Sequence, residues 1–275
     1  MSRFPESPSI PKFSCVDGEE LNTETAYRLL VGCVVPRPIA WVTTMDAQGR
    51  VNAAPFSSYN YVATSPPMLA INIAKRPGSG ATKDTAHNIS TLREFVVNVA
   101  TLDNMDLMHQ SAQEFPPEVS EVEVLGIPLL ASTVKLMRRP AEKAGYGQTQ
   151  RFLQDGFDAF RHMGGAEPFL ATKHVRVPRI ACSPVQMECR LDQVVQLGRG
   201  INTLYIGEVV AFHLSDAVYD GQRIDSAAMR PIARLGGPYY GALGDIIHRP
   251  MLQKPPGGEG WAPVHSTKKR DGDLS

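Results

Sequence analysis

Two stretches of the sequence carry side chains that could hold one ligand between them. The first, residues 52–67, reads NAAPFSSYNYVATSPP and contains no charge, although it joins two apolar runs. The hydroxyl groups of Ser57 and Ser58, two tyrosines and a backbone left accessible by small residues suit a planar heteroaromatic ligand with polar edges. A buried connection between strands, with no ligand, explains the same composition equally well.

The second stretch, residues 75–89, reads KRPGSGATKDTAHNI and favours an anion. Arg76 and Lys83 flank a flexible Gly-Ser-Gly turn, and Thr85 lies near the start of a predicted helix, where N–H groups and basic side chains bind phosphate together. The P-loop pattern and the glycine-rich dinucleotide pattern are both missing. A solvated basic loop explains this stretch more simply, but the strand predicted between the two stretches would let both reach one nucleotide-like ligand.

The composition narrows the classes of partner and site. The 275 residues include 28 basic and 28 acidic side chains, so attraction to nucleic acid or to a membrane surface is not expected. The four cysteines form no CxxC pair and no HExxH pattern occurs, which predicts no metal site and makes reduced thiols the simpler state for Cys182 and Cys189. Because no run approaches the ~20 apolar residues of a membrane span and no apolar signal core is present, we expect a cytoplasmic protein.

Most of the remaining chain shows strand patterns separated by turns. Apolar and β-branched runs predict strands at 39–45, 50–56, 68–74, 94–100, 133–138, 184–198 and 203–214. A DAQG turn joins the first two as a hairpin, and GRGIN joins the last two. Shorter helices are predicted after Asn22, at 84–92 and at 102–115. The pattern favours a mainly β fold, an antiparallel Greek-key barrel with a few peripheral helices, and the lack of βαβ alternation argues against a Rossmann fold.

The chain is expected to contain one main domain, residues 21–250. A Pro/Ser-rich arm, residues 1–20, precedes it, and a flexible tail, residues 251–275, follows it. Residues 139–182 carry Gly, Gln, Phe and a mixed helical pattern, and they are interpreted as a segment inserted into the barrel.

In order along the chain, the runs RPIAWVTTMDAQGRVNAAPFSSYNYVATSPPMLAINI, KDTAHNI, EFVVNVA, GEVVAFHL and PIARLGGPYYG resemble the flavin reductase-like family. The fold of this family is the FMN-binding split β-barrel, also found in flavoredoxin-like proteins. The resemblance covers residues 22–138 and 183–250, and the fixed order of the runs is more specific than any one of them.

The resemblance implies a homodimer that binds FMN in a groove near the subunit interface. By the same resemblance, Thr43 and Thr44 lie beside the flavin, and the isoalloxazine edge is lined by Asn52, Ala53, Ala54 and Pro55. Ser57 and Ser58 approach the ribityl–phosphate end. The phosphate itself is held by Arg76, Lys83, Asp84 and Thr85. Asn88 follows in the same pattern and is expected to cap or brace the helix.

The family implies an NAD(P)H-dependent flavin reductase that passes hydride or electrons from NADH or NADPH through FMN to a flavin or a small acceptor. A monooxygenase is one partner that such a reductase supplies. No catalytic side chain is assigned, because the flavin carries the chemistry. Two alternatives stay open: a non-catalytic flavin-binding or electron-transfer protein, and an enzyme whose 139–182 segment forms a pocket for an organic substrate.

A few other side chains have more than one interpretation. His213 could point toward the flavin, but a structural histidine with its own partner is the simpler reading. Tyr239 and Tyr240 could reach the flavin of a second subunit or only pack at an interface. Trp41 and Met108 are predicted to lie in the core.

Overall fold

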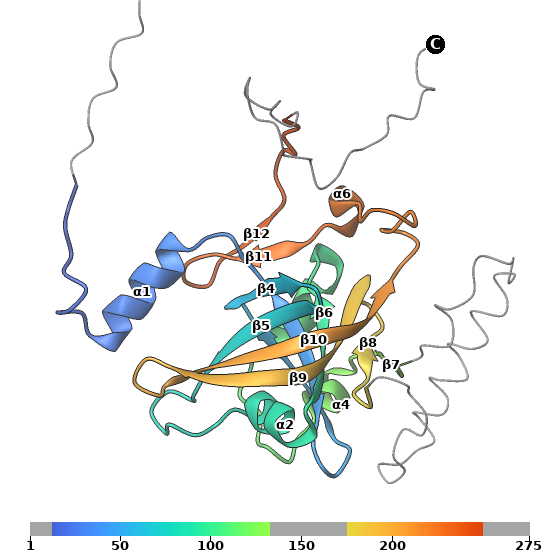
Figure 1. Ribbon diagram of the computed structural model, residues 1–275, viewed down its shortest axis with the longest axis horizontal. Coiled ribbons are helices and arrows are strands. Elements are labelled where there is room, and N and C mark those ends of the chain that lie inside the picture. The colour runs from blue at the N-terminus through green and yellow to red at the C-terminus, as the bar shows by residue number, and fades with distance from the viewer. Residues whose placement is uncertain (1–12, 133–174, 250–275) are drawn as a thin grey trace, which may run out of the picture. The chain divides into compact units, whose positions relative to one another are not determined.

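The computed structural model describes residues 13–132 and 175–249 (Figure 1). By its internal contacts the chain divides into one compact unit that ends at Leu243 and a second unit that begins at Gly244. The described residues of the second unit form neither helix nor strand. The predicted strand 133–138, the predicted arm up to residue 12 and the whole of the predicted tail lie outside the described residues.

A seven-stranded antiparallel sheet forms the compact unit, in the order β3-β2-β6-β9-β10-β5-β4. Its strands are β2 (Ala40–Met45), β3 (Val51–Phe56), β4 (Tyr59–Thr64), β5 (Pro67–Ala74), β6 (Glu94–Val99), β9 (Val185–Leu197) and β10 (Asn202–Leu214). β3 and β4 follow each other in the chain, yet they lie at opposite edges of the sheet. The mainly β, antiparallel split-barrel prediction is therefore confirmed.

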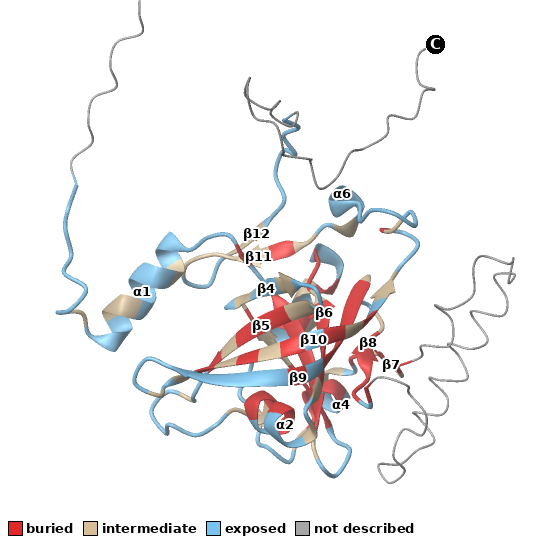
Figure 2. Cartoon of the chain, viewed as in Figure 1, coloured by how far each residue is buried: buried red, intermediate tan, exposed pale blue. Residues whose placement is uncertain are grey.

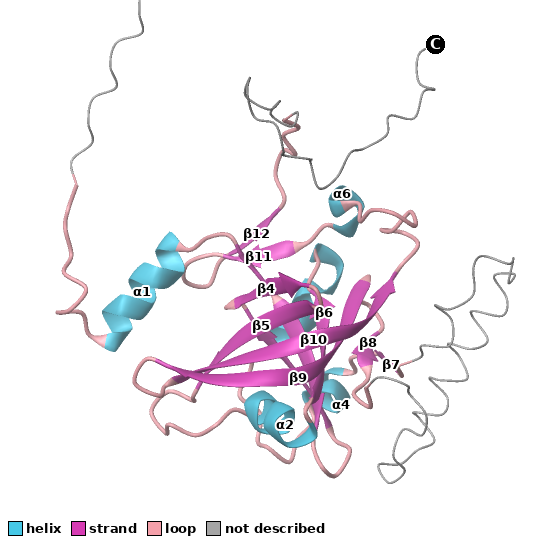
Figure 3. Cartoon of the chain, in the orientation of Figure 1, coloured by secondary structure: helices cyan, strands magenta, loops and turns pink. Residues whose placement is uncertain are grey.

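Short helices surround the strands (Figure 3). They are α1 (Thr23–Cys33), α2 (Asp84–Leu92), the 3-10 helix η1 (Leu102–Asn104), α3 (Met105–Gln110), α4 (Glu121–Leu125) and α6 (Ser226–Met229). Two small sheets complete the described structure: β1 (Arg37–Pro38), β11 (Ile232–Arg234) and β12 (Tyr240–Ala242) in one, and β7 (Leu129–Leu130) with β8 (Arg179–Ile180) in the other. None of the helices in the described ranges is long and apolar enough to cross a membrane.

Both predicted hairpins are present. β2 pairs with β3 across the turn at 46–49, where the Asp46 carboxylate accepts the backbone N–H groups of Gln48 and Arg50 at 2.9 Å each. Gly49 closes this turn with a φ of 84°, a backbone conformation that favours glycine. β9 pairs with β10 along their whole length, with register shifts near Gly207.

Three predicted segments differ from the structure. Residues 52–67 are not one loop: β3 and β4 occupy most of them, joined by a bend at Ser57 and Ser58, because the backbone of 59–64 pairs with β5. The helix predicted at 102–115 begins as η1 and ends at Gln110, where the Ser111 hydroxyl bonds to the carbonyl of Met108 at 2.8 Å. Residues 175–182, assigned to the insertion, help to form the core, since Val175, Val177 and Ile180 are buried.

The two faces of β2 belong to two packing clusters, and buried residues concentrate on the strands of the large sheet (Figure 2). Trp41 belongs to one cluster with Met108 and Ile180, and Val42 belongs to the other with Phe95. Trp41 is fully buried, and its indole N–H donates to the Ser111 hydroxyl at 2.9 Å. The predicted core positions Trp41 and Met108 are thus confirmed, and alternation along β2 explains why Thr43 and Thr44 face different clusters.

Replacing Gly207 with Ala should destabilise the fold by about 1–3 kcal/mol. A methyl group at this position would lie 2.5 Å from Cζ of Phe95, a side chain with no exposed surface into which it could move. Chemical denaturation measures the change in the free energy of unfolding. The control is Gly18→Ala, where nothing lies within 4 Å. Equal stabilities for the two variants would contradict the close packing of β10 on Phe95.

Candidate flavin site on β3

The free edge of β3 is held by the start of α4. The Ser120 hydroxyl donates to the carbonyl of Val51 at 2.6 Å, and the Glu121 carboxylate accepts the backbone N–H of Ala53 at 3.4 Å. Ser120 also caps α4 by accepting the N–H of Glu123. Glu121 is only 5% exposed, and burial raises the pKa of its carboxyl. Side chains therefore satisfy the backbone groups that a neighbouring strand would otherwise pair.

The amide of Asn52 joins this edge to α2. The amide orientation that satisfies every neighbour directs its nitrogen to Glu121 at 3.1 Å and its oxygen to the Thr85 hydroxyl at 3.0 Å. One turn further along α2, the Asn88 amide donates to the Thr44 hydroxyl at 3.1 Å. Asn88 thus braces the helix, as predicted, and the N-terminal end of α2 is fixed beside β3.

The predicted phosphate residues gather at the beginning of α2. Arg76 forms an ion pair with Asp84 at 2.7 Å and lies 3.9 Å from Glu114. Lys83 lies over the Phe56 ring, 5.8 Å from its centroid. Burial, followed by the positive charge of Arg76, lowers the pKa of Lys83. Two cations this close repel each other, so an anion between them would be stabilised.

The backbone of α2 adds to this preference. Lys83 occupies the position before the first helical residue, and its side chain makes no capping hydrogen bond to the first turn. The first N–H groups of a helix have no intrahelical partner, and the helix dipole favours negative charge there. Arg76, Lys83 and the start of α2 together fit a phosphate group.

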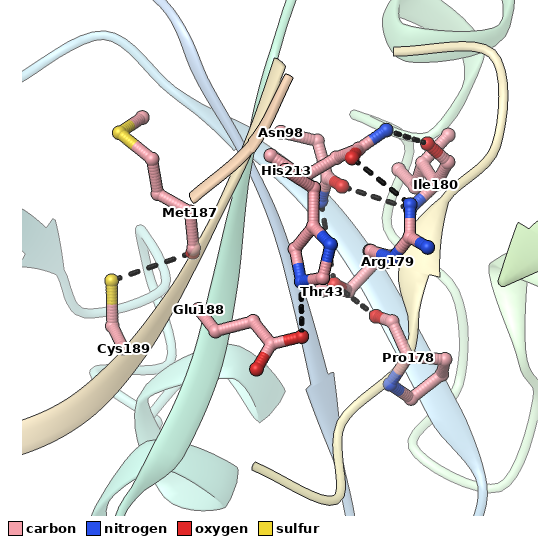
Figure 4. Close-up of polar contacts among 10 residues, drawn as sticks. Thr43, Asn98, Pro178, Arg179, Ile180, Met187, Glu188, Cys189 and His213 are labelled. Atoms are coloured by element: carbon pink, nitrogen blue, oxygen red, sulfur yellow. Dashed lines mark hydrogen bonds and ion pairs between the residues drawn. The ribbon is translucent and has the colours of Figure 1, made fainter. Parts of the chain in front are cut away.

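Thr43 binds a different part of the chain (Figure 4). Its hydroxyl donates to the carbonyl of Pro178 at 2.7 Å and accepts from the Asn98 amide at 3.3 Å. The Asn98 oxygen accepts the N–H of Ile180 at 2.8 Å. Thr43 and Thr44 are both fully buried with their hydroxyls bonded inside the protein, so their place beside a flavin stays a prediction.

A buried ionic cluster lies near Thr43 (Figure 4). His213 and Glu188 point toward each other, with Nε2 and Oε1 2.7 Å apart, and Glu188 has no exposed surface. Arg179 donates to the Gln186 side chain at 3.1 Å, and burial lowers the pKa of Arg179 to about 10 while Glu188 acts against this shift. His213 therefore has a partner within the protein, as expected of a structural histidine.

Two hollows open beside β3. The first, about 260 Å³, is lined by Asn52, Asp84 and Asn88 among others. The second, about 230 Å³, is lined by Pro55 and Ser57. Ala54 is half-buried, and Ser58 is exposed. The predicted residues thus lie on β2, on β3 and the bend after it, and around the start of α2, and they do not share one hollow.

Sequence reasoning missed two groups at this site. Glu121, which holds the N–H of Ala53, is 68 positions away from it in the chain. The pattern Ser120-x-x-Glu123 is a helix-start signature and could have revealed α4, although not its contact with β3. Arg37, whose Nε donates to the Ser57 hydroxyl at 3.4 Å, had no local signal of a site.

Comparisons with known proteins agree with this fold. A family model described as "Flavin reductase like domain" matches residues 31–144, and a domain of unknown function matches residues 120–181. An uncharacterized protein from Halalkalibacterium halodurans is 33% identical over 242 residues, which are 86% of this chain and 96% of that relative.

Two solved structures are similar along nearly the whole chain. Nitrilotriacetate monooxygenase component B from Bacillus cereus is 26% identical with a TM-score of 0.69, and the match covers 87% of this chain and 100% of that one. The 2-nitrobenzoate 2-nitroreductase of Pseudomonas fluorescens is 26% identical with a TM-score of 0.67, covering 89% and 100%.

The fold and these similarities define a split-barrel protein of the flavin reductase type. The chain belongs to the flavin reductase-like family.

Replacing Glu121 with Ala should destabilise the protein by about 1–3 kcal/mol, because the Asn52 amide and the Ala53 N–H lose their buried acceptor. Glu121→Gln keeps an acceptor and should cost less. Denaturation of both variants and of Glu123→Gln, an exposed glutamate on the same helix, provides the comparison. A Glu121→Ala variant as stable as the Glu123 control would contradict the role of Glu121.

The same carboxyl should make stability depend on pH. Its pKa is raised above 4.5, so the folded state keeps the proton to higher pH than the unfolded chain does. The stabilisation of the folded state by the protonated Glu121 carboxyl is fully present below pH 4.5. It is lost as the pH rises through the raised pKa of the folded state. The free energy of unfolding of the wild type should therefore fall relative to Glu121→Gln across that range. Parallel pH profiles for the two proteins would contradict the raised pKa.

Proposed function

We propose that this protein is an FMN-dependent oxidoreductase, an NAD(P)H-dependent flavin reductase that passes reducing equivalents to a flavin or a small organic acceptor. The observation that carries the proposal is the pair of cations, Arg76 and Lys83, at the uncapped start of α2 and beside β3. This arrangement would supply a phosphate site next to β3, on which Ala54 and Pro55 are only half-buried.

The residues present fit FMN in this proposal. Arg76 and Lys83 would hold the phosphate, and Asp84 would keep the guanidinium of Arg76 in place. Asn52 and Glu121 would fix the strand that faces the ring, since both are already bonded to their neighbours. When bound, FMN supplies a group that accepts hydride from a nicotinamide and passes electrons on. The protein contributes binding and orientation.

Two similar structures each support one of the two candidate electron acceptors. Component B of nitrilotriacetate monooxygenase is one part of a monooxygenase system, which favours a reductase with a monooxygenase partner. The 2-nitrobenzoate 2-nitroreductase favours direct reduction of an organic substrate. The second candidate draws further support from the hollow at Pro55 and Ser57, which adjoins the proposed flavin residues.

A homodimer is part of the proposal. β4 is an edge strand whose Tyr61 and Val62 are 69% and 52% exposed. An exposed apolar edge is a common site of association, and a second copy of the chain would cover it. Dimer formation by this edge would also place a second subunit near the residues that follow β3.

Replacing Lys83 or Arg76 with Ala should weaken FMN binding by about 1–3 kcal/mol each, because a charged contact to the phosphate is lost. Riboflavin, which has the same ring and no phosphate, should bind the variants and the wild type alike. Quenching of flavin fluorescence measures both ligands. The control is Lys75→Ala, an exposed lysine in the same stretch. Unchanged FMN affinity in both variants would remove the phosphate assignment.

FMN affinity should also fall as pH rises toward 10.5, the ordinary pKa of a lysine. Because burial and Arg76 lower the pKa of Lys83, this side chain loses its proton, and with it the attraction for phosphate, below that value. Lys83→Ala should lack this part of the pH dependence. Subtracting the pH profile of riboflavin affinity from that of FMN affinity removes any contribution from titration of the ring. If this difference is as independent of pH in the wild type as in Lys83→Ala, Lys83 does not belong to the phosphate site.

A further inference from the structure

The small sheet beside the barrel places two arginines directly opposite each other. In the antiparallel pairing of β1 with β11, Arg37 is the partner of Arg234, and β11 in turn pairs Arg234 with Tyr240. Residues directly opposite in such a sheet point to the same face, and like charges there are destabilising. The three side chains line the hollow of about 230 Å³ that also contains Pro55 and Ser57, here called the arginine pocket.

Arg37 is a buried cation with neutral partners. It is 8% exposed, and its guanidinium donates to the carbonyls of Val31, Val34 and Leu235 and to the Ser57 hydroxyl. These bonds use four of the five N–H groups of an arginine and fix its position. In the described part of the chain no carboxylate forms an ion pair with it. A buried charge without a counter-charge is costly, and a bound anion would remove that cost.

Arg234 has donors left for a ligand. One of its terminal nitrogens donates to the Tyr240 hydroxyl at 2.7 Å and the other to the carbonyl of Gly237 at 2.9 Å. Its remaining N–H groups form no hydrogen bond within the described residues. Tyr240 lies 2.9 Å from Nδ1 of His109, which holds the phenol in place.

The charge of the pocket is unbalanced as a whole. Its described lining contains Arg28, Arg37 and Arg234 and no aspartate or glutamate. Arg28 forms a loose, exposed ion pair with Glu24 at 3.8 Å and donates to the Thr25 hydroxyl at 3.4 Å. The charge of Arg28 is largely screened by solvent, so the two arginines of the small sheet dominate.

Apolar side chains also line the arginine pocket. Val31 and Pro55, both half-buried, line it together with Ile39 and Met108, which are buried in the packed core. A hollow of this size accommodates a single ring but not a dinucleotide. Apolar side chains in one hollow with two guanidinium groups suit a ligand with a flat carbon skeleton at one end and a carboxylate at the other.

From this geometry we infer that the arginine pocket binds a small planar organic acid, with its carboxylate at Arg234 and Arg37 and its ring against Val31 and Pro55. The binding of the acid does not depend on a flavin. We further infer that this acid is the electron acceptor, a role that rests on the proposed function. It is supported by Pro55 and Ser57, which line the pocket and are also predicted flavin neighbours.

The test uses benzoate and benzamide, which have nearly the same shape and differ in charge. Isothermal titration of the full chain, without flavin, should show benzoate binding at least about tenfold more tightly than benzamide, the effect expected of a charge-assisted contact. Arg234→Gln should weaken benzoate by about tenfold to a hundredfold and leave benzamide unchanged. Tyr240→Phe should cause a smaller loss.

The matched control is Arg230→Gln. Arg230 lies four residues earlier in the same segment, pairs with Asp103 at 2.7 Å and does not line the pocket, so benzoate affinity should be unchanged. Arg37 is unsuitable as the main test, because its bonds to the carbonyls of Val31, Val34 and Leu235 connect the end of α1 to the small sheet, and their loss would disturb the local structure as well as the pocket.

Several results would overturn the inference. They are no benzoate binding to the wild type, equal affinity for benzamide, and an Arg234→Gln variant that binds benzoate normally. Displacement of benzoate by inorganic phosphate or by FMN would also overturn it, by assigning the arginines to the cofactor site. Failure of the wild type to bind FMN would instead refute the proposed function, while the benzoate titration would still decide the pocket.

Discussion

The structure depends on how the backbone groups at the free edge of β3 find hydrogen-bond partners. Edge strands present backbone N–H and C=O groups without a neighbouring strand, and such groups need partners when buried. Ser120 and Glu121 at the start of α4 provide these partners to Val51 and Ala53. Because side chains and not a further strand complete the edge, the sheet ends at β3, and Ala54 and Pro55 beyond this contact remain half-buried at the surface.

The same strand connects two regions of positive charge. Through Asn52 it is bonded to Thr85, which sets the start of α2 and with it the position of Lys83. Through Ser57 it is bonded to Arg37 and so to the small sheet. One strand and its bend thus relate the proposed phosphate site to the arginine pocket. The rigidity of this arrangement comes from buried side-chain hydrogen bonds, which is what precise positioning of a cofactor requires.

Local patterns in the sequence predicted the parts of the fold that local forces determine. Both hairpins, α2 and the buried Trp41 follow from turn residues and from alternation along single strands. β4 was missed because its exposed edge carries no regular alternation: four of its six residues, Asn60, Tyr61, Val62 and Thr64, are exposed. The polar contacts were missed for another reason. Arg37 reaches the carbonyl of Leu235 across 198 positions, and no local pattern encodes such a contact.

The central claim is that this split barrel holds a flavin that a nicotinamide reduces. The most direct measurement is the visible absorption spectrum of the purified protein loaded with FMN, recorded without oxygen before and after addition of NADH and, separately, NADPH. We expect the flavin bands to bleach with at least one nicotinamide. Flavin bands that persist with both would contradict the reductase and leave a flavin carrier, and a protein that retains no FMN would contradict the flavin site itself.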